Sequence, residues 1–189
     1  MIQPKPAKTP VEMVAVTVNG EQLQLPQGKN LLAALLEADI YVPHYCWHPS
    51  LTIDGNCRLC LIEIEGQPRP GISCNMKCAE GLKIRTEGEM VEDCRKGMME
   101  FLLVNHPLDC PICDRGGECM LQRYSMAYGT GHARTTDDRR RFEKPQLDPL
   151  IDIERNRCIM CTRCVRFMDQ VAGEHTLAVY GRGDRKSVV

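Results

Sequence analysis

The sequence predicts an α+β fold divided into small domains. Short runs of alternating apolar residues near the N-terminus indicate strands, and a later stretch repeats its apolar side chains at helical spacing. Aromatic residues make up only 5% of the 189-residue chain, so a large conventional core is not expected. The twelve cysteines can stabilise small domains that have little hydrophobic core, either as disulfides or as metal ligands.

The N-terminal part is predicted to form strands around a helix. Residues 14–25 alternate apolar and polar side chains on both sides of an Asn-Gly pair, which predicts a β-hairpin. Asn30 can then cap a helix that runs to about Ala38. Residues 61–65 alternate again and predict a further strand, which completes a small α+β unit.

The middle of the chain changes to a helical pattern. Residues 89–104 predict a helix because apolar side chains recur at four-residue steps, at Met90, Cys94, Met98 and Leu102. Pro107 ends that helix, and a second, short helix is expected at 121–127. We therefore expect a first domain at residues 11–86, a second at 87–128, a linker at 129–149 and a third, incomplete domain at 150–189.

Composition excludes several classes of function. Twenty-four basic residues face twenty-five acidic ones, whereas nucleic-acid-binding proteins normally carry a basic excess. No apolar stretch is long enough to span a bilayer, so direct membrane insertion is not expected. Residues 1–10 read as a flexible arm without the apolar core of a secretion signal. A reducing, cytoplasmic setting follows, in which clustered cysteines are metal ligands more often than disulfides.

The first cysteine group has the spacing C-x10-C-x2-C-x13-C and consists of Cys46, Cys57, Cys60 and Cys74. Four thiolates suit a [2Fe–2S] cluster, and Gly55 would let the backbone aim its amides at the sulfur atoms. A structural zinc site with four cysteine ligands is the alternative. Cys78 could compete with Cys74 as the fourth ligand, although we prefer Cys74.

The second group combines one histidine with three cysteines: His106, Cys110, Cys113 and Cys119. These residues could bind zinc, or they could hold a [4Fe–4S] cluster in which an imidazole replaces one thiolate. A Gly-Gly pair at 116–117 allows the loop to wrap tightly. Cys94 lies outside the groups and is expected to be a buried core thiol.

The third group, Cys158, Cys161 and Cys164, has the C-x2-C-x2-C run that is characteristic of [4Fe–4S] ferredoxins. No cysteine follows Cys164 in the sequence, so the site is one ligand short. We expect the fourth ligand to come from beyond the end of the chain, from a partner or from a leftover cysteine. A chain cut inside a domain is the simplest account.

Together the groups resemble the large iron–sulfur subunit of respiratory complex I, NADH:quinone oxidoreductase. The resemblance runs from about residue 12 to the end, and it is carried by the stretches HYCWHP at 44–49, GNCRLC at 55–60, EFLLVNHPLDCPIC at 100–113 and RCIMCTRC at 157–164. It implies a β-grasp [2Fe–2S] domain, a histidine-ligated [4Fe–4S] domain and the start of a ferredoxin-like [4Fe–4S] domain.

The resemblance also implies a place in a larger enzyme. Electrons would arrive from NADH through a flavin on a partner subunit and leave through downstream iron–sulfur subunits toward quinone, at the cytoplasmic face of the inner membrane. The chain alone would offer no complete active site. The closest alternative is the diaphorase iron–sulfur subunit of an NAD-reducing hydrogenase or a formate dehydrogenase. An alternative of another class is a zinc-stapled interaction module without a redox role.

Overall fold

The N-terminal unit is a five-stranded mixed sheet with one helix. The computed structural model describes residues 12–181 and 187–188, so the predicted arm at residues 1–10 and part of the predicted third domain lie outside the described residues. The strand order is β2 (Glu21–Pro26), β1 (Met13–Val18), β5 (Lys83–Arg85), β3 (Leu61–Ile64) and β4 (Gly71–Ile72). β1 and β5 run parallel, whereas the other neighbours are antiparallel.

Local sequence signals account for this unit. Asn19 and Gly20 have φ angles of 54° and 92°, as a tight hairpin turn between β1 and β2 requires. The Asn30 side chain accepts a hydrogen bond of 3.1 Å from the Ala33 amide and so caps α1 (Leu31–Glu37). The predicted hairpin, helix and third strand are therefore confirmed. The core between the sheet and α1 is aliphatic and includes Val16, Leu31, Leu35 and Ile62, all fully buried.

The long helix α2 (Glu89–Leu103) is present as predicted, but its buried face differs from the predicted one. The buried stripe is Val91, Arg95 and Met99, and Met90 is exposed. Cys94 is only half-buried, so its prediction as a buried core thiol was wrong. The physical reason is Arg95, whose Nη2 donates to the Thr86 carbonyl at 2.9 Å and which therefore occupies an interior position.

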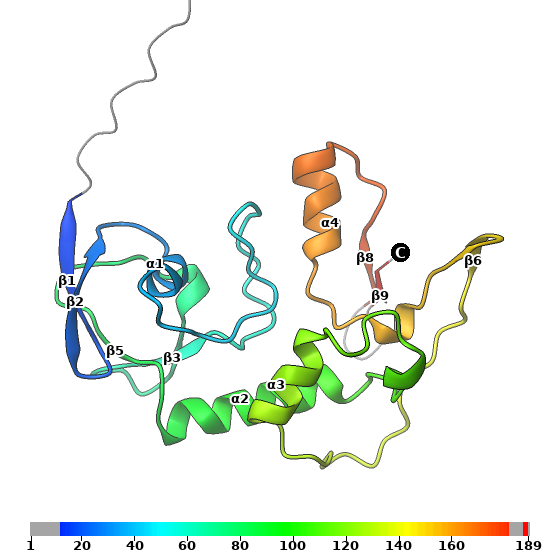
Figure 1. Ribbon diagram of the computed structural model, residues 1–189, viewed down its shortest axis with the longest axis horizontal. Coiled ribbons are helices and arrows are strands. Elements are labelled where there is room, and N and C mark those ends of the chain that lie inside the picture. Colours follow the sequence, from blue (N-terminus) through cyan, green and yellow to red (C-terminus); the bar gives the residue numbers. More distant parts are fainter. Residues whose placement is uncertain (1–11, 182–186, 189) are drawn as a thin grey trace, which may run out of the picture.

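The remaining elements are short. α3 (Met120–Tyr128) packs against α2, and the end of the predicted linker pairs with the following residues as the hairpin β6 (Gln146–Asp148) and β7 (Ile151–Asp152). Figure 1 shows the sheet and α1 on one side, α2 and α3 in the middle, and the C-terminal elements on the other side. These C-terminal elements are α4 (Arg163–Phe167), a π-helical turn at Met168–Ala172, β8 (Val179–Tyr180) and β9 (Ser187–Val188).

Three short 3-10 turns lie close to the cysteine groups: η1 (Ser73–Asn75), η2 (Cys110–Ile112) and η3 (Arg155–Arg157). Cys74 lies within η1 and Cys110 begins η2, while Cys158 directly follows η3. The ligand residues are thus carried mainly by loops and single turns between the regular elements. Within the described residues, no helix combines the length and the apolar character that crossing a membrane requires.

Candidate metal centres

The first group is buried in the loop that connects α1 to β3 and in η1. Cys46, Cys57, Cys60 and Cys74 are each at most 6% exposed. The Cys46 amide donates to the Cys57 sulfur at 3.3 Å, and the Cys60 and Cys74 thiols are hydrogen-bonded to each other. The structure therefore brings all four predicted ligands together in two thiol pairs.

Backbone amides make this site suitable for sulfur anions. The pKa of Cys46 is lowered to about 6, first because the Cys57 thiol donates to it and then because backbone N–H groups of residues 55–57 do so. Burial opposes this shift but does not outweigh it. Gly55 has a φ of +68°, so it adopts the left-handed backbone that this loop requires and that glycine tolerates best. Amides aimed at sulfur stabilise a negatively charged iron–sulfur core, which fits the donor set.

Cys78 occupies a different environment from the four grouped thiols. Its amide donates to the Lys29 carbonyl at 2.9 Å, and burial raises the pKa of its thiol. By contrast, the pKa of Cys74 is raised first by its hydrogen bond with Cys60. Cys46 and Cys57 also act on the Cys74 thiol electrostatically. The Cys74 thiol therefore interacts with the other three thiols, whereas none of them is among the causes that shift the pKa of Cys78.

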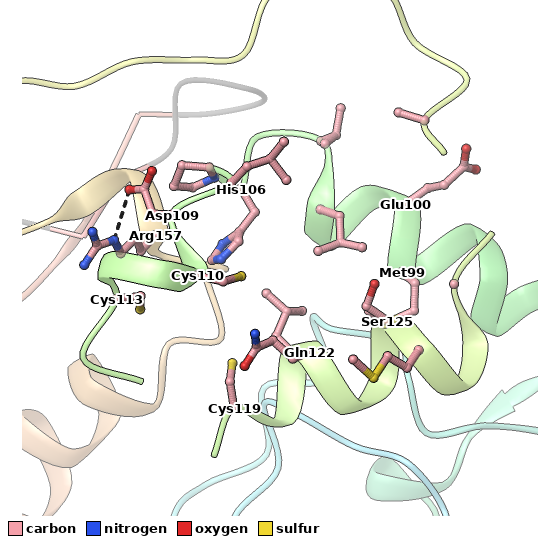
Figure 2. Close-up of a pocket in the computed structure, with 18 of the residues that line it drawn as sticks. Met99, Glu100, His106, Asp109, Cys110, Cys113, Cys119, Gln122, Ser125 and Arg157 are labelled. Carbon is pink, nitrogen blue, oxygen red and sulfur yellow. Dashed lines mark hydrogen bonds and ion pairs between the residues drawn. The ribbon is translucent and has the colours of Figure 1, made fainter. Parts of the chain in front are cut away.

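The second group surrounds a cavity of about 320 Å³. His106 comes just after α2, Cys110 and Cys113 flank η2, and Cys119 precedes α3. Figure 2 shows the His106 ring and the three thiols directed toward this cavity. Three separate segments thus place the four predicted ligands around one space.

His106 has an unpaired ring nitrogen that fits a ligand role. Its Nδ1 is buried and has no hydrogen-bond partner among the described residues. Buried polar atoms are rarely left unpaired without a reason. The pKa of His106 is lowered, first by burial and also by the nearby Arg139 and Arg157, although Asp109 opposes the shift. A neutral imidazole is the form that binds metals, so this environment favours ligation.

Gly116 shapes the loop of the second group. A β-carbon at this position would lie 2.7 Å from the Cys110 carbonyl oxygen and 3.1 Å from that of Cys113. The Gly116 amide donates to the Cys113 carbonyl at 2.8 Å and closes the turn. The loop can therefore wrap as tightly as the Gly-Gly pair predicted.

The third group spans the loop before α4 and the first turn of that helix, because Cys164 lies within α4. Met160 and Thr162 have φ angles of 60° and 57°, so the backbone twists into the left-handed region on both sides of Cys161. The Met160 amide donates to the Cys158 sulfur at 3.4 Å. Burial raises the pKa of Cys158, and the Cys161 and Cys164 thiols raise it further. The three predicted ligands therefore lie close together, with Cys164 exposed.

Side chains next to the ligands connect the three groups, and sequence reasoning missed these contacts. Arg157 and Asp109 form an ion pair of 3.2 Å between the third and second groups (Figure 2). The Tyr124 hydroxyl on α3 donates to the His44 carbonyl at 3.2 Å beside the first group. The Asn56 side chain donates to the Met160 carbonyl at 2.7 Å, which joins the first and third groups.

Coordination of a single ion has its own geometric requirement. Zinc needs four ligands at about 2.0–2.3 Å from one point. Within the part of the chain that the structure describes, no three His, Cys, Asp or Glu side chains are gathered closely enough to hold one metal ion.

Three family models match consecutive parts of the chain. A 2Fe-2S iron-sulfur cluster binding domain matches residues 11–89, and an NADH-ubiquinone oxidoreductase-G iron-sulfur binding region matches residues 95–134. The ferredoxin-like domain of NADH-quinone oxidoreductase subunit 3 matches residues 148–189. The chain therefore contains [2Fe–2S]- and [4Fe–4S]-binding domains, which confirms the predicted cofactor types and the α+β fold class.

Curated relatives agree with these models. The mitochondrial NADH dehydrogenase [ubiquinone] iron-sulfur protein 1 of Solanum tuberosum is 45% identical over 95% of this chain and 24% of the relative. The NADH-ubiquinone oxidoreductase 75 kDa subunit of Reclinomonas americana is 46% identical over 90% of this chain and 25% of the relative. The chain belongs to the family of the 75 kDa iron–sulfur subunit of NADH-quinone oxidoreductases. It spans about a quarter of the length of these curated members, in their N-terminal part.

A solved structure outside complex I is also similar to this member of the 75 kDa subunit family. It is described as an NAD+-reducing [NiFe]-hydrogenase in the H2-reduced state. The matched chain is 30% identical with a TM-score of 0.84, and the match covers 93% of this chain and 74% of that chain. The fold is thus shared by both kinds of NAD-linked oxidoreductase, as the predicted alternative implied.

Proposed function

We propose that this chain carries electrons from NADH toward quinone as the N-terminal part of the large iron–sulfur subunit of respiratory complex I. The observation that carries the proposal is the arrangement of the three ligand groups. Two groups have four proposed ligands each, and the third lies beside both of them through the bond from Asn56 to the Met160 carbonyl and the ion pair of Arg157 with Asp109. A series of neighbouring clusters is a path for electrons.

The proposed ligands are those predicted from the sequence. A [2Fe–2S] cluster would be held by Cys46, Cys57, Cys60 and Cys74, and a [4Fe–4S] cluster by His106, Cys110, Cys113 and Cys119. Cys158, Cys161 and Cys164 would hold a second [4Fe–4S] cluster, with its fourth ligand supplied from outside this chain. The proposed domains are residues 11–86, 87–128 and 150–189, with a linker at 129–149.

Each bound cluster would supply reversible one-electron chemistry. The protein contributes the rest. The cysteine thiolates would hold the iron, and the amides at residues 55–57 would stabilise negative charge at the first site. The imidazole of His106 is neutral, so it removes one negative charge from the second ligand set. Burial of the first group excludes water from its sulfur atoms.

The partners and location follow from the same proposal. A flavin- and NADH-binding subunit would deliver electrons, and further iron–sulfur subunits would receive them. The chain would be attached peripherally to the cytoplasmic face of the inner membrane through these subunits. It would not oxidise NADH alone, because the flavin that accepts hydride would belong to the partner.

Anaerobic reconstitution with iron and sulfide tests the proposal. We expect a brown protein that contains acid-labile sulfide and shows EPR signals of a [2Fe–2S] and a [4Fe–4S] cluster after reduction. A colourless protein that binds zinc alone would support the interaction module instead. NADH turnover by the isolated, flavin-free chain would contradict the proposed division of labour between subunits.

The hydrogenase diaphorase is a second candidate because the similar solved structure is a hydrogenase and is matched over most of its chain. The two functions predict different activities of the native complex that contains this chain. A complex I subunit would copurify with NADH-dependent quinone reduction. A diaphorase subunit would copurify with H2-dependent reduction of NAD+. The curated relatives favour the first activity.

A further inference from the structure

Arg166 on α4 is a buried cation that lies between the first and third cysteine groups. Only 9% of its surface is exposed. Its guanidinium donates to the carbonyl oxygens of Cys46 and Cys161, which belong to the two different groups. Arg166 is 120 residues from Cys46 in sequence, so the contact is made by the tertiary fold alone.

The hydrogen-bond partners of Arg166 are all neutral. Besides the two cysteine carbonyls, it donates to the Thr52 carbonyl and, at 3.1 Å, to the Thr162 hydroxyl. No carboxylate forms an ion pair with it among the residues that the structure describes, and the Asp54 carboxylate is linked to it only through the Thr162 hydroxyl, which donates to Asp54 at 2.5 Å. An arginine stays charged in proteins, and a buried charge without a counter-charge is costly.

Bound clusters would supply negative charge closer to the Arg166 carbonyl partners than the Asp54 carboxylate, which is reached only through Thr162. Thiolate-ligated iron–sulfur clusters carry net negative charge, and that charge becomes more negative on reduction. Two of the carbonyls that hold Arg166 belong to cysteines proposed as ligands of two different clusters. The cation is therefore placed next to both sites at which negative charge would accumulate.

We propose that Arg166 is a positioning residue that holds the first and third groups together and whose charge is shared by both clusters. This inference rests on the proposed function. A cation near a cluster favours its reduced form and so raises its reduction potential. Because one guanidinium serves both groups, its loss should lower the potentials of both clusters and loosen the contact between them.

The decisive experiment is a redox titration followed by EPR on the reconstituted chain. We expect Arg166→Gln, which removes the charge at similar size, to make the [2Fe–2S] cluster harder to reduce. A unit charge about 10 Å away in a medium of effective dielectric constant about 20 changes an equilibrium by roughly tenfold. For one electron, a tenfold change corresponds to about 59 mV.

Two further variants separate charge from packing. Gln170→Ala removes two hydrogen bonds to Thr52, of 2.9 and 2.6 Å, from the same interface without changing the charge. We expect the equilibrium constant for reduction of the [2Fe–2S] cluster in this variant to stay within twofold of the wild-type value. Arg166→Lys keeps the positive charge but replaces the planar guanidinium by a single ammonium group. We expect the reduction potential of the [2Fe–2S] cluster in this variant to stay near that of the wild type.

The outcomes distinguish this inference from the proposed function. A wild-type chain that binds no cluster would remove the proposed function itself. Normal clusters with an unchanged potential in Arg166→Gln would overturn only the role of Arg166. An equal shift in Gln170→Ala would also overturn it, because packing alone would then explain the effect. If Arg166→Gln fails to fold, a tenfold shift in folded Arg166→Lys would overturn the charge argument.

Discussion

Tyr124→Phe tests whether one hydroxyl ties the first group to the second. The Tyr124 side chain comes from α3, directly after the second group, and is 4% exposed. Its hydroxyl bonds the Tyr41 hydroxyl at 2.5 Å, donates to the His44 carbonyl at 3.2 Å and accepts from the His44 amide at 3.4 Å. Phenylalanine keeps the ring and its contact with Tyr45, where the ring centroids are 6.2 Å apart, so only the hydrogen bonds are lost.

The structure sets the size of the expected effect. A neutral hydrogen bond contributes about 0.5–1.5 kcal/mol to stability. Tyr41 is 57% exposed, so water can replace its lost partner at little cost. The His44 carbonyl is less accessible and loses more. We expect a total loss of about 1–2 kcal/mol, which lowers the melting temperature of a chain of this size by roughly 2–8 °C.

Thermal unfolding monitored by circular dichroism measures this effect. Tyr128→Phe is a matched control on the same helix, because the Tyr128 ring stacks under Arg95 with 5.4 Å between the Arg95 Cζ and the ring centroid. We expect this control to stay within about 0.5 kcal/mol of the wild type, because phenylalanine keeps the ring beside Arg95 and the Tyr128 hydroxyl makes no hydrogen bond within the described residues. Equal stability of Tyr124→Phe and the wild type would refute the reasoning, and so would an equal loss in both variants.

Three further predictions concern the second group and the response to pH. His106→Cys should keep a [4Fe–4S] cluster but alter its redox behaviour, and an EPR spectrum of the reduced variant identical to that of the wild type would count against ligation by His106. Gly116→Ala should abolish the second cluster while the [2Fe–2S] EPR signal persists, because the new methyl group would overlap the Cys110 carbonyl oxygen at 2.7 Å; an unchanged iron content would disprove this. Burial raises the pKa of Tyr124, so its stabilising contribution is complete below its unfolded pKa of about 10 and declines progressively as the pH rises from there toward its higher folded pKa. Urea unfolding between pH 9 and pH 11 should therefore show a smaller loss of stability in Tyr124→Phe than in the wild type.

Local signals made much of the fold predictable. The Asn-Gly turn, the Asn30 cap and the alternating strands each depend on residues that are close in sequence. The buried face of α2 could not be found in this way, because two adjacent stripes share the same four-residue spacing. Arginine is usually exposed, so sequence reasoning predicts that the helix face with Met90 and Cys94 is buried and that Arg95 faces solvent. The fold instead buries Arg95, because the Thr86 carbonyl accepts a hydrogen bond from it.

In the candidate sites, too, local features could be predicted and long-range contacts could not. Cysteine spacing is a local property, so the members of each ligand group could be predicted. The relation between the groups could not, because it depends on contacts such as Arg157 with Asp109, which are 48 residues apart. Neither residue carries a motif that marks it as a partner of the other. The one sequence feature that could have pointed to this pair is that Asp109 and Arg157 each stand directly before a cysteine and carry opposite charges.

The contacts between groups have one property in common, which bears on how the chain would conduct electrons. Each contact involves a ligand or a residue within two positions of one: His44 beside Cys46, Asp109 beside Cys110, and Cys46 itself. The long side chains of Tyr124, Arg157 and Arg166 therefore help to fix the separations between the sites, each through a partner at or next to a proposed ligand. Most described residues of the proposed linker at 129–149 are exposed, but Arg140 donates to the Asn105 side chain at 2.9 Å and to the Cys158 carbonyl at 3.3 Å, so this segment also contacts the second and third groups. Because electron transfer depends steeply on distance, substitutions at these contacts should alter the proposed path more than substitutions at exposed positions of residues 129–149 that make no such contact.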